Sequence, residues 1–252
     1  MTGKGNQSPP PKNPSALEAA REILLQSNNI VFLGGAGVST ESGIPDFRSE
    51  DGIYSQSFAY LPETVLSRSF FLRHPDVFYD FYRQRCLLPM LTSLPNPAHL
   101  KLAQWEKEGR LRAVVTQNID DLHQKAGSQN VLQLHGTVYR NQCLTCWREH
   151  SLEEVLKMEG PARCTCGGLI HPGIVLFEEA LDEKVMAKAI EYIRTADVLL
   201  VAGSSMSVYP AAGLVDYYSG HRLILINKDI SGIDRQADII LRGKVGEILG
   251  AM

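Results

Sequence analysis

Short apolar runs that alternate with helical stretches are the feature that most constrains the fold of this 252-residue chain. The runs hold only three to five residues, which suits buried strands better than helices, and the segments between them have helical periodicity. Strands that alternate with helices predict an α/β fold with a parallel sheet covered on both faces. The predicted strands are Ile30 to Leu33, Ala113 to Thr116, Val131 to Leu134, Val198 to Ala202, Leu223 to Ile226 and Ile239 to Leu241. The predicted helices include Ala98 to Lys107, Glu183 to Arg194 and Ala211 to Tyr218.

The start of the ordered chain is predicted at Ser15. Residues 1–14 are polar and proline-rich, and we expect them to be disordered. Ser15 and Glu18 have the spacing of a capping box, and an apolar stripe follows them. A helix is therefore predicted from there to about Ser27, leading into the first strand.

Two segments interrupt the alternation of strands and helices. Residues 44–95 form an insertion rich in aromatic side chains, and residues 137–172 contain four of the five cysteines. We expect the two segments to form a smaller domain, made of a helical insertion and a metal-binding module, with a ligand cleft where it meets the large part. The large part then comprises residues 15–43, 96–136 and 173–252, within one functional unit over 15–252.

The charge composition argues against a nucleic-acid-binding protein. The chain has 25 basic and 28 acidic residues and a net charge of −3, which gives no electrostatic footprint for nonspecific nucleic-acid binding. No run approaches the roughly 18 apolar residues that a membrane span needs, and the N-terminus has no apolar signal-peptide region. The sequence predicts a soluble, cytoplasmic protein without a membrane partner, and it leaves the oligomeric state open.

A glycine-rich turn directly follows the first predicted strand. Gly34-Gly-Ala-Gly37 would expose backbone N–H groups, and Ser39 adds a hydroxyl. This order is typical of a Rossmann-like sheet, in which a phosphate binds at the first strand–helix turn. A GxG pattern alone could equally be a plain tight turn, but its place after the first strand of an α/β pattern favours a nucleotide.

The residues after this turn differ from those of a dehydrogenase. The third glycine of the usual dinucleotide fingerprint is absent at Thr40, and Gly43-Ile44-Pro45 should end the helix after little more than a turn. An acid, an aromatic ring and a guanidinium follow at Asp46, Phe47 and Arg48. Such a loop could reach over the nicotinamide end of a cofactor, which favours attack at the glycosidic carbon over hydride transfer.

Polar residues follow several predicted strands where the strands end. Because the carboxyl ends of parallel strands converge on one edge of a sheet, we expect these residues to line one pocket. A lone histidine at such a place is more often structural, and Asp120 could instead cap the next helix, so both alternatives stay open. The residues concerned are Gln117, Asn118, Asp120, His135, Gly203, Ser204, Ser205 and Asn227.

Four cysteines have the spacing of a metal site. Cys143-x₂-Cys146 is followed after seventeen residues by Cys164-x-Cys166. Four thiolates around Zn²⁺ leave no open position, so the ion should be structural rather than catalytic. The second pair departs from the commoner C-x₂-C spacing. The alternative, a zinc-ribbon module that binds nucleic acid, is disfavoured by the negative net charge.

In combination, these motifs resemble the sirtuins, NAD-dependent protein lysine deacylases, from about Ala16 onward. The resemblance implies that NAD is consumed as a co-substrate: nicotinamide leaves, and the acyl group of an acyl-lysine ends on ADP-ribose. Acyl-lysine proteins or peptides would be the partners. The matches, in family order, are GAGVSTESGIPDFRS at 35–49, TQNID at 116–120 with Leu122-His123, Leu134-His135-Gly136, the four cysteines, Gly203-Ser-Ser205 and Ile226-Asn227.

The resemblance also implies residue roles. His135 would be the general base that activates a ribose hydroxyl, a role worth a factor of about 10² to 10⁴. Asn118 and Asp120 would face the nicotinamide and its ribose, and they join His135 as the catalytic candidates. Ile44 and Asp46 would hold the carboxamide, and Phe47 would screen the ribosyl cation from water. Further residues implied in binding NAD are Gly35, Ala36, Gly37, Ser39, Arg48, Gln117, Gly203, Ser204, Ser205, Asn227, Lys228, Asp229 and Val245.

Two segments resemble the strands between which a sirtuin binds its peptide substrate. One is Gly173 to Glu179, where Val175 and Phe177 would line the acyl-lysine channel, and the other is Ser207 to Pro210, with Val208 as a peptide contact. Glu178 replaces the usual glycine after the phenylalanine. It would favour basic residues beside the acyl-lysine, or it is simply a solvated charge.

The choice of acyl group depends on one helical face. Phe78, Phe81, Tyr82 and Arg85 fall at helical spacing, and Tyr82-x-x-Arg85 matches the pair with which some sirtuins hold succinyl or malonyl groups. Arg83 and Arg85 could instead be solvated or paired with Asp80. Acetyl is therefore the expected acyl group, with acidic acyl groups as the alternative. Mono-ADP-ribosyl transfer to protein is the rival activity, and a nonenzymatic NAD-binding or zinc-ribbon interaction module is the alternative from another class.

Overall fold

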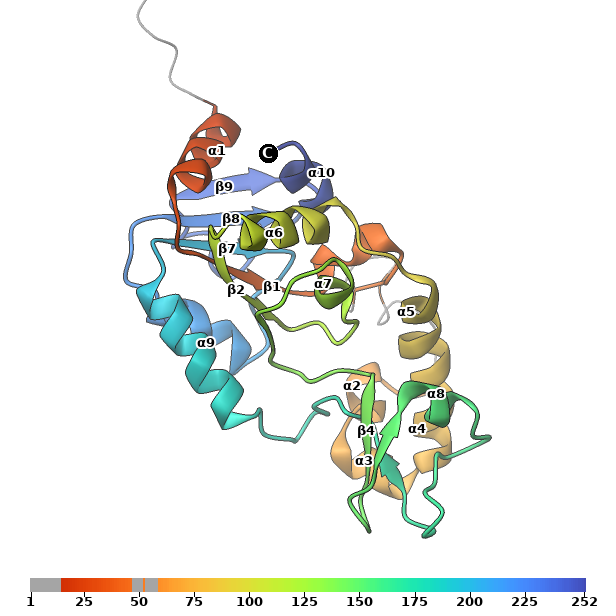
Figure 1. Cartoon of the computed structure of the whole chain (residues 1–252). Coiled ribbons are helices and arrows are strands. Elements are labelled where there is room, and N and C mark those ends of the chain that lie inside the picture. The colour runs from red at the N-terminus through yellow and green to blue at the C-terminus, as the bar shows by residue number, and fades with distance from the viewer. Residues whose placement is uncertain (1–14, 47–51, 53–58) are drawn as a thin grey trace, which may run out of the picture.

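A six-stranded sheet is the largest element of the computed structural model, which describes residues 15–46, 52 and 59–252. All of its strands run parallel, in the order β3-β2-β1-β7-β8-β9. Numbered within this sheet alone, that order is 3-2-1-4-5-6, which is the order of the Rossmann fold. The predicted α/β class with a Rossmann-like sheet is therefore confirmed. The strands are β1 (Ile30–Gly34), β2 (Leu111–Thr116), β3 (Val131–Gln133), β7 (Val198–Ala202), β8 (Leu223–Asn227) and β9 (Ile239–Arg242) (Figure 1).

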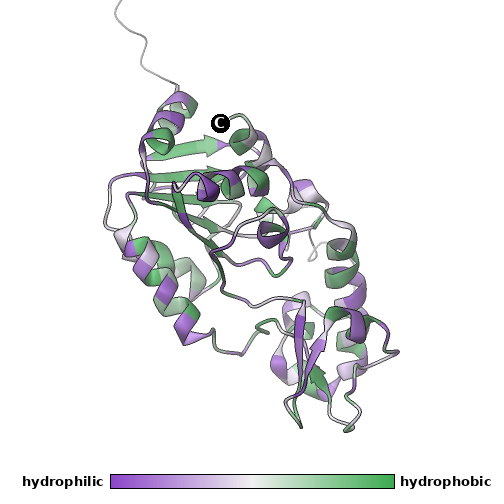
Figure 2. Cartoon of the chain, in the orientation of Figure 1, coloured by the Kyte–Doolittle hydropathy of each residue, from purple (hydrophilic) through white to green (hydrophobic). Residues whose placement is uncertain are grey.

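Helices cover both faces of this sheet. Successive side chains of a strand point to opposite faces, so Phe32 of β1 lies in one core cluster and Leu33 in another. One face is covered by α1 (Ala16–Gln26), α6 (Pro97–Lys107) and α10 (Val245–Gly250), and the other by α9 (Glu183–Thr195) and the 3₁₀ segment η5 (Ala211–Tyr217). Burial on both faces explains why the strands read as unbroken apolar runs, as the hydropathy colouring of Figure 2 shows.

A third core cluster lies at the other end of the molecule. The short antiparallel sheet β5-β4-β6 packs there with helices of the aromatic insertion (Figure 1). The strands are β4 (Arg140–Cys143), β5 (Glu149–Ser151) and β6 (Ile170–His171). The short helix α8 (Leu152–Leu156) directly follows β5. The insertion contributes α2 (Pro62–Val65), α3 (Arg68–Arg73), α4 (Pro75–Phe81), the π-helical segment η4 (Tyr82–Leu87) and α5 (Leu88–Thr92).

Two side chains of the insertion fasten it to the cysteine-containing segment. The Tyr79 hydroxyl donates to the Ile170 carbonyl at 2.5 Å. The Arg83 guanidinium donates to the carbonyls of Met158 at 2.8 Å and Gly160 at 2.5 Å, and it also lies over the Tyr79 ring. Charged donors make stronger hydrogen bonds than neutral ones, so Arg83 is the main polar link between these two segments.

The helices follow the sequence pattern less uniformly than the strands. The capping box of α1 is present, with Ser15 and Glu18 bonded reciprocally. The segment predicted as a helix after Gly37 is instead two 3₁₀ turns, η1 (Ala36–Val38) and η2 (Thr40–Ser42). Residues 211–217, also predicted as a helix, are 3₁₀-helical, and a glycine at 213 weakens regular helix there. Residues 1–14 lie outside the described part, and the domain boundaries stay a prediction.

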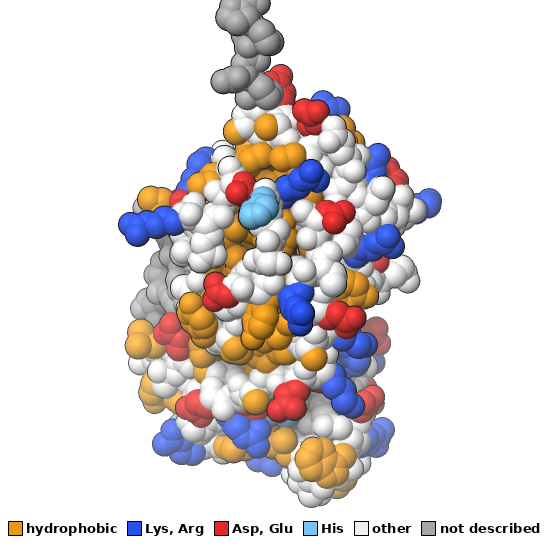
Figure 3. Space-filling model, turned by 90° about the vertical axis from the view of Figure 1, so that its left-hand side faces the viewer, with side chains coloured by type: hydrophobic (Ala, Val, Ile, Leu, Met, Phe, Trp, Pro, Cys, Tyr) orange, Lys and Arg blue, Asp and Glu red, His pale blue; other side chains and the backbone are white. Residues whose placement is uncertain are grey.

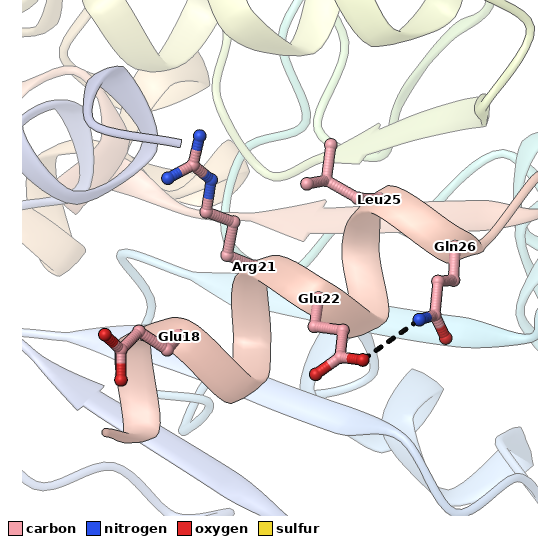
Figure 4. A pocket seen from close by; sticks show the side chains of 5 residues that line it. All are labelled: Glu18, Arg21, Glu22, Leu25 and Gln26. Atoms are coloured by element: carbon pink, nitrogen blue, oxygen red, sulfur yellow. Dashed lines mark hydrogen bonds between the residues drawn. The ribbon is translucent and has the colours of Figure 1, made fainter. Parts of the chain in front are cut away.

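The surface of α1 is a shallow hollow without convergent polar groups. Glu18, Arg21, Glu22, Leu25 and Gln26 all project from this one helix, and Gln26 donates to Glu22 at 3.1 Å (Figure 4). The face drawn in Figure 3 carries apolar side chains along its middle, with charges of both signs around them. Among the described residues, no helix has the length and apolar character needed to cross a membrane.

Candidate active site

The glycine-rich turn packs against the end of β7, where the strand order of the sheet reverses. Gly37 donates its N–H to the Gly203 carbonyl at 2.8 Å, and Gly35 donates to Ala202 at 3.2 Å. A Cβ atom on Gly37 would lie 2.8 Å from Gly203 Cα, and one on Gly203, whose φ is 60°, would lie 2.4 Å from the Val38 nitrogen. Only glycines permit this approach, which leaves the backbone at the switch point open to a ligand.

Three polar side chains form a buried network beside this turn. Ser39 donates its hydroxyl to Asp120 at 2.7 Å and accepts a bond from the Asn118 amide at 3.0 Å. All three are at least nine-tenths buried. Ser39 follows β1, whereas Asn118 and Asp120 follow β2, so the network joins the ends of two neighbouring strands as expected for this edge.

Asp120 serves two purposes at once. Its other carboxylate oxygen accepts the Leu122 N–H at 2.9 Å, which supports the first turn of α7 (Leu122–Lys125). Burial raises the pKa of Asp120, while the bonds from Leu122 and Ser39 oppose that shift. The two interpretations of Asp120 are therefore compatible: it supports the start of a helix, and it also lies beside the glycine turn.

His135 is oriented by a backbone carbonyl. Its Nδ1 lies 2.9 Å from the Gln117 carbonyl oxygen. Because a carbonyl can only accept, Nδ1 carries the proton and Nε2 is the nitrogen with a free lone pair. Burial lowers the pKa of His135, with the Gln117 bond acting in the opposite direction. A neutral imidazole with Nε2 available is the form that a general base requires.

The remaining nucleotide-binding candidates are arranged around the ends of β7 and β8. The Gln117 amide donates to the Ser204 hydroxyl at 3.1 Å, and the Asn227 amide donates to the Ser204 and Asp229 carbonyls at 3.4 and 3.1 Å. Ser205 is exposed, as are Lys228 and Asp229. Val245 is different, because its side chain is 2% exposed and packs in the core at the start of α10.

The segment expected to hold nicotinamide is only partly described. Gly43 has a φ of 86°, which ends η2 and turns the chain toward Ile44 and Asp46. Ile44 is 7% exposed and packs with the core of the insertion, and Asp46 is half-buried. The predictions for Phe47 and Arg48 lie outside the described residues.

The segment expected to bind peptide bridges the two parts of the molecule. Val175 donates its N–H to the His135 carbonyl at 2.9 Å, and Phe177 exchanges backbone bonds with Leu66 and Arg68. Phe177 is 40% exposed, so its apolar ring stays accessible to a ligand. Val208, in the opposing segment, is half-buried and lies just before η5.

Glu178 is not a freely solvated charge. It adopts a φ of 75°, a conformation that favours glycine, and its two carboxylate oxygens accept the backbone N–H and the hydroxyl of Ser69, each at 2.9 Å. These bonds tie the loop after Phe177 to the first turn of α3. The side chain remains exposed, so its charge stays available at the rim of the segment.

Tyr82 and Arg85 lie in a π-helical segment rather than on the α-helical face that was expected, and their pairing stays a prediction. Residues 82–87 are π-helical, with the Leu88 N–H bonded to the Arg83 carbonyl five residues back, so the spacing of three no longer aligns side chains as in an α-helix. Tyr82 is fully buried, and its hydroxyl has no hydrogen-bond partner among the described residues. Pairing of Asp80 with Arg83 is absent too, since Asp80 accepts from Gln84 and Arg83 binds carbonyls.

The four cysteines converge. The ligand atoms of Cys143, Cys146, Cys164 and Cys166 all lie within 4.8 Å of one another. Two of the sulfur pairs are separated by 3.5 and 3.7 Å. A tetrahedral Zn²⁺ with thiolates at about 2.3 Å requires sulfurs about 3.8 Å apart, so the cluster fits a structural zinc ion despite the unusual spacing of the second pair.

Asn96 was missed by the sequence analysis. Its side-chain amide donates to the Val38 carbonyl at 2.7 Å and to the Ser42 hydroxyl at 3.1 Å, while its side-chain oxygen accepts the Ala98 N–H as the cap of α6. The dipeptide Asn96-Pro97 signals a helix start. That signal predicts a helix cap, but the hydrogen bonds from Asn96 to the glycine-turn loop can be seen only in the tertiary structure.

The comparisons with known proteins agree with this geometry. A family profile described as the Sir2 family matches residues 35–210. The NAD-dependent protein deacetylase of Clostridium perfringens is 49% identical over 234 residues, covering 91% of this chain and 95% of that protein. The NAD-dependent protein deacylase of Pyrococcus furiosus is 42% identical over 236 residues, covering 90% of this chain and 93% of the relative.

Solved structures give the same result. A Sir2 protein with a deacetylated p53 peptide and 3′-O-acetyl ADP ribose is similar with a TM-score of 0.84 at 38% identity, covering 90% of this chain and 93% of the other. A Sir2 protein bound to a propionylated peptide has a TM-score of 0.82 at 37% identity, covering 92% and 95%. The resemblance seen in the sequence motifs therefore extends to the whole fold.

Proposed function

Because this chain belongs to the Sir2 family, we propose that it is an enzyme that uses NAD to remove acyl groups, foremost acetyl, from protein lysine side chains. The products are nicotinamide, O-acyl-ADP-ribose and free lysine. The observation that carries the proposal is His135, which lies just after the edge strand β3 and is held by the Gln117 carbonyl with Nε2 as its proton acceptor. The chemistry of NAD lies in its glycosidic bond, which releases nicotinamide when a nucleophile reaches the ribose carbon.

The glycine turn fits the pyrophosphate of NAD. A side chain on Gly35 would collide with Ser204 Cβ at 2.8 Å, so this cradle stays open only because glycine stands there. Backbone N–H groups of the turn and the Ser204 and Ser205 hydroxyls are donors suited to a phosphate. Asn227, Lys228, Asp229 and Val245 are the residues proposed to flank the adenosine end.

The chain's own residues divide the catalytic work. His135 Nε2 takes a proton from a ribose hydroxyl, so that the hydroxyl can accept the acyl carbon. Asn118 and Asp120, fixed by Ser39, orient the nicotinamide ribose. Ile44 and Asp46 receive the carboxamide, and Phe47 and Arg48 complete that side of the site. Holding these groups on strand ends supplies the orientation that the transfer needs.

The peptide is proposed to bind as an added strand between residues 173–179 and 207–210. Main-chain bonds would give affinity with little dependence on sequence, and Val175, Phe177 and Val208 would line the acyl-lysine channel. Glu178 contributes negative charge at the rim. Relatives described as bound to acetylated and propionylated peptides support a peptide substrate.

Zn²⁺ is proposed to be structural. Cys143, Cys146, Cys164 and Cys166 would occupy all four positions, which leaves none for water or substrate. The metal would hold β4 and the neighbouring loops together. We also propose a cytoplasmic location, on the sequence features alone.

The decisive experiment measures nicotinamide release from NAD with and without a panel of acyl-lysine peptides. Release that depends on an acetyl peptide, with O-acetyl-ADP-ribose as product, supports deacylation. Labelled ADP-ribose left on protein would instead establish mono-ADP-ribosyl transfer, and no nicotinamide release with any peptide would contradict the proposal.

A matched pair of variants tests the role of His135. His135→Ala should lower kcat by about 10² to 10⁴ while NAD still binds, because a positioned base is lost. His221→Ala, on an exposed loop, is the control and should leave turnover unchanged. Near-normal turnover of a folded His135→Ala protein would refute the assignment.

Succinyl and acetyl versions of one peptide test the acyl preference. We expect a higher kcat/KM for acetyl, because the α-helical alignment assumed for Tyr82 and Arg85 is absent from their π-helical segment. A succinyl preference that Arg85→Met removes would restore the acidic-acyl alternative.

A further inference from the structure

Two histidines outside the catalytic site lie side by side in the interior. His99 of α6 and His123 of α7 are 0% and 1% exposed, with ring centroids 4.7 Å apart. Phe32 of β1 closes another side of the His123 ring, at 5.7 Å between centroids. The pair therefore occupies the junction between two helices and the central strand that carries the glycine turn.

The hydrogen bond to His99 defines which of its nitrogens carries the proton. The Asn96 backbone N–H donates to His99 Nδ1 at 3.3 Å, so Nδ1 is unprotonated and Nε2 carries the proton. Burial lowers the pKa of both histidines, which keeps both rings neutral. Each neutral ring then has one donor and one acceptor.

Four buried polar atoms at this junction lack a partner among the described protein groups. They are His99 Nε2, both ring nitrogens of His123 and the Ser128 hydroxyl oxygen. Ser128 is joined to the same place, because its N–H donates to the His123 carbonyl at 3.0 Å. Buried polar groups in proteins are nearly always hydrogen-bonded, directly or through an internal water. We therefore expect hydrogen bonds, direct or through water, to these four atoms.

Both ends of the pair lead to the candidate NAD site. At one end, Asn96 donates to His99 and also holds the Val38 carbonyl and the Ser42 hydroxyl of the glycine-turn loop. At the other end, His123 belongs to α7, whose first turn is bonded to Asp120, the acceptor of the Ser39 hydroxyl. The pair thus lies between the two loops that the Ser39–Asp120 bond joins.

We propose that His99 and His123 are positioning residues for NAD: a neutral donor–acceptor chain that holds α6 against α7 and so sets the relative placement of Ser39 and Asp120. Asn96 donates to His99 Nδ1, and internal water would join His99 Nε2, the His123 nitrogens and the Ser128 hydroxyl into one chain. Apolar rings of the same size would fill the space but could not define this relative placement. The inference rests on the proposed use of NAD.

The test compares direct NAD binding by calorimetry in His123→Phe, His123→Gln and the control His221→Phe. Phenylalanine keeps the ring volume but removes both nitrogens, and we expect the Kd for NAD to rise by about tenfold, because small displacements of positioning groups are costly. Glutamine, a neutral donor and acceptor, should recover much of the loss. In turnover, the KM for NAD should rise more than the KM for peptide.

A second measurement does not depend on activity. In ¹⁵N-histidine-labelled protein, His99 should show the Nε2–H tautomer and both rings should be neutral at pH 6. An imidazolium at either position, or wild-type NAD affinity in both His123→Phe and His99→Phe, would overturn the proposal. If the phenylalanine variants do not fold, NAD binding by His123→Gln and the test for an imidazolium in the unmodified protein can still overturn the proposal. Failure of the deacylase proposal is separate, since it would appear as absent nicotinamide release in the unmodified protein.

Discussion

The edge of the parallel sheet and the cysteine-containing end of the molecule are stabilised by different physics. In the large part, six hydrogen-bonded strands are buried between two layers of helices. The candidate site lies at the carboxyl ends of these strands, where Gly37 packs against Gly203. At the other end, a three-stranded sheet with strands of two to four residues depends on an aromatic core and four converging thiols. The large sheet is stabilised by hydrophobic burial on both faces. We expect the cysteine-containing segment to need a zinc crosslink, because its strands of two to four residues form few ladder hydrogen bonds of their own.

Metal removal should separate these two regions most clearly. Chelation of zinc, or Cys143→Ser, should unfold residues 137–172 and abolish peptide turnover, because a structural zinc site contributes on the order of 10 kcal/mol to folding of its module. Hydrogen exchange should show that β1, β2 and β7 keep their protection. Lys157→Ala, an exposed position between the two cysteine pairs, is the control. Simultaneous unfolding of the large sheet would contradict the distinction.

The converse change is made at the glycine contact. Gly37→Val should place methyl groups against Gly203, where even a Cβ atom lies 2.8 Å from backbone, and such overpacking costs about 1–3 kcal/mol. NAD binding should be lost while the zinc content stays at one per chain. Gly213→Ala is the matched control, because a Cβ there has no neighbour closer than 3.5 Å. Unchanged NAD affinity in Gly37→Val would show that the turn is not part of the site.

Acidic pH should weaken the large region through its buried histidines. Burial lowers the pKa of His99 from 6.5 to about 4 in the folded protein. The unfolded chain therefore takes up a proton at higher pH than the folded one, and the free energy of unfolding falls as pH drops from about 6.5 to about 4, by up to about 3 kcal/mol. Urea titrations across this range measure it. In a His99→Phe protein, the free energy of unfolding should depend less steeply on pH. An unchanged dependence would show that His99 is not its source.

The smallest effect is expected at the junction of the two regions. Burial alone would raise the pKa of Glu179, but bonds from His171, the Leu176 N–H and Arg68 lower it to about 2. The stability this carboxylate supplies is present above about pH 4.5 and is lost as pH falls toward 2. Glu179→Gln should therefore lower the free energy of unfolding by about 1 kcal/mol at pH 7, since the group is partly exposed to solvent. Equal stability at neutral pH would mean that solvent screens the ion pair fully.

Strand placement could be predicted from the sequence because burial on both sheet faces gives strands an unmistakable apolar signature. Val198–Ala202 was predicted residue for residue, and the polar groups after the strands met at one edge because parallel strands all end there. The Asp120 cap was left open because one carboxylate can serve two neighbours, and only the tertiary contact with Ser39 shows that it does.

The aromatic insertion could not be predicted in the same way. A period of 3.6 residues was assumed for residues 78–85, but Pro89 has no N–H to offer the Arg85 carbonyl, and the chain winds wider over Tyr82–Leu87. The contacts of Asn96 with Val38 and of His99 with His123 escaped prediction because they join residues far apart in sequence.

The bonds from Arg83 to the Met158 and Gly160 carbonyls give the zinc ion influence beyond its own ligands. If the loops that contain Met158 and Gly160 became disordered, the half-buried Arg83 guanidinium would lose its hydrogen-bond acceptors. The helical segment that carries Tyr79 and Tyr82 would then lose its polar link to the cysteine-containing segment. Binding of the metal would then be required for assembly of the active enzyme. A protein molecule without zinc would be inactive as a deacylase but could still bind NAD.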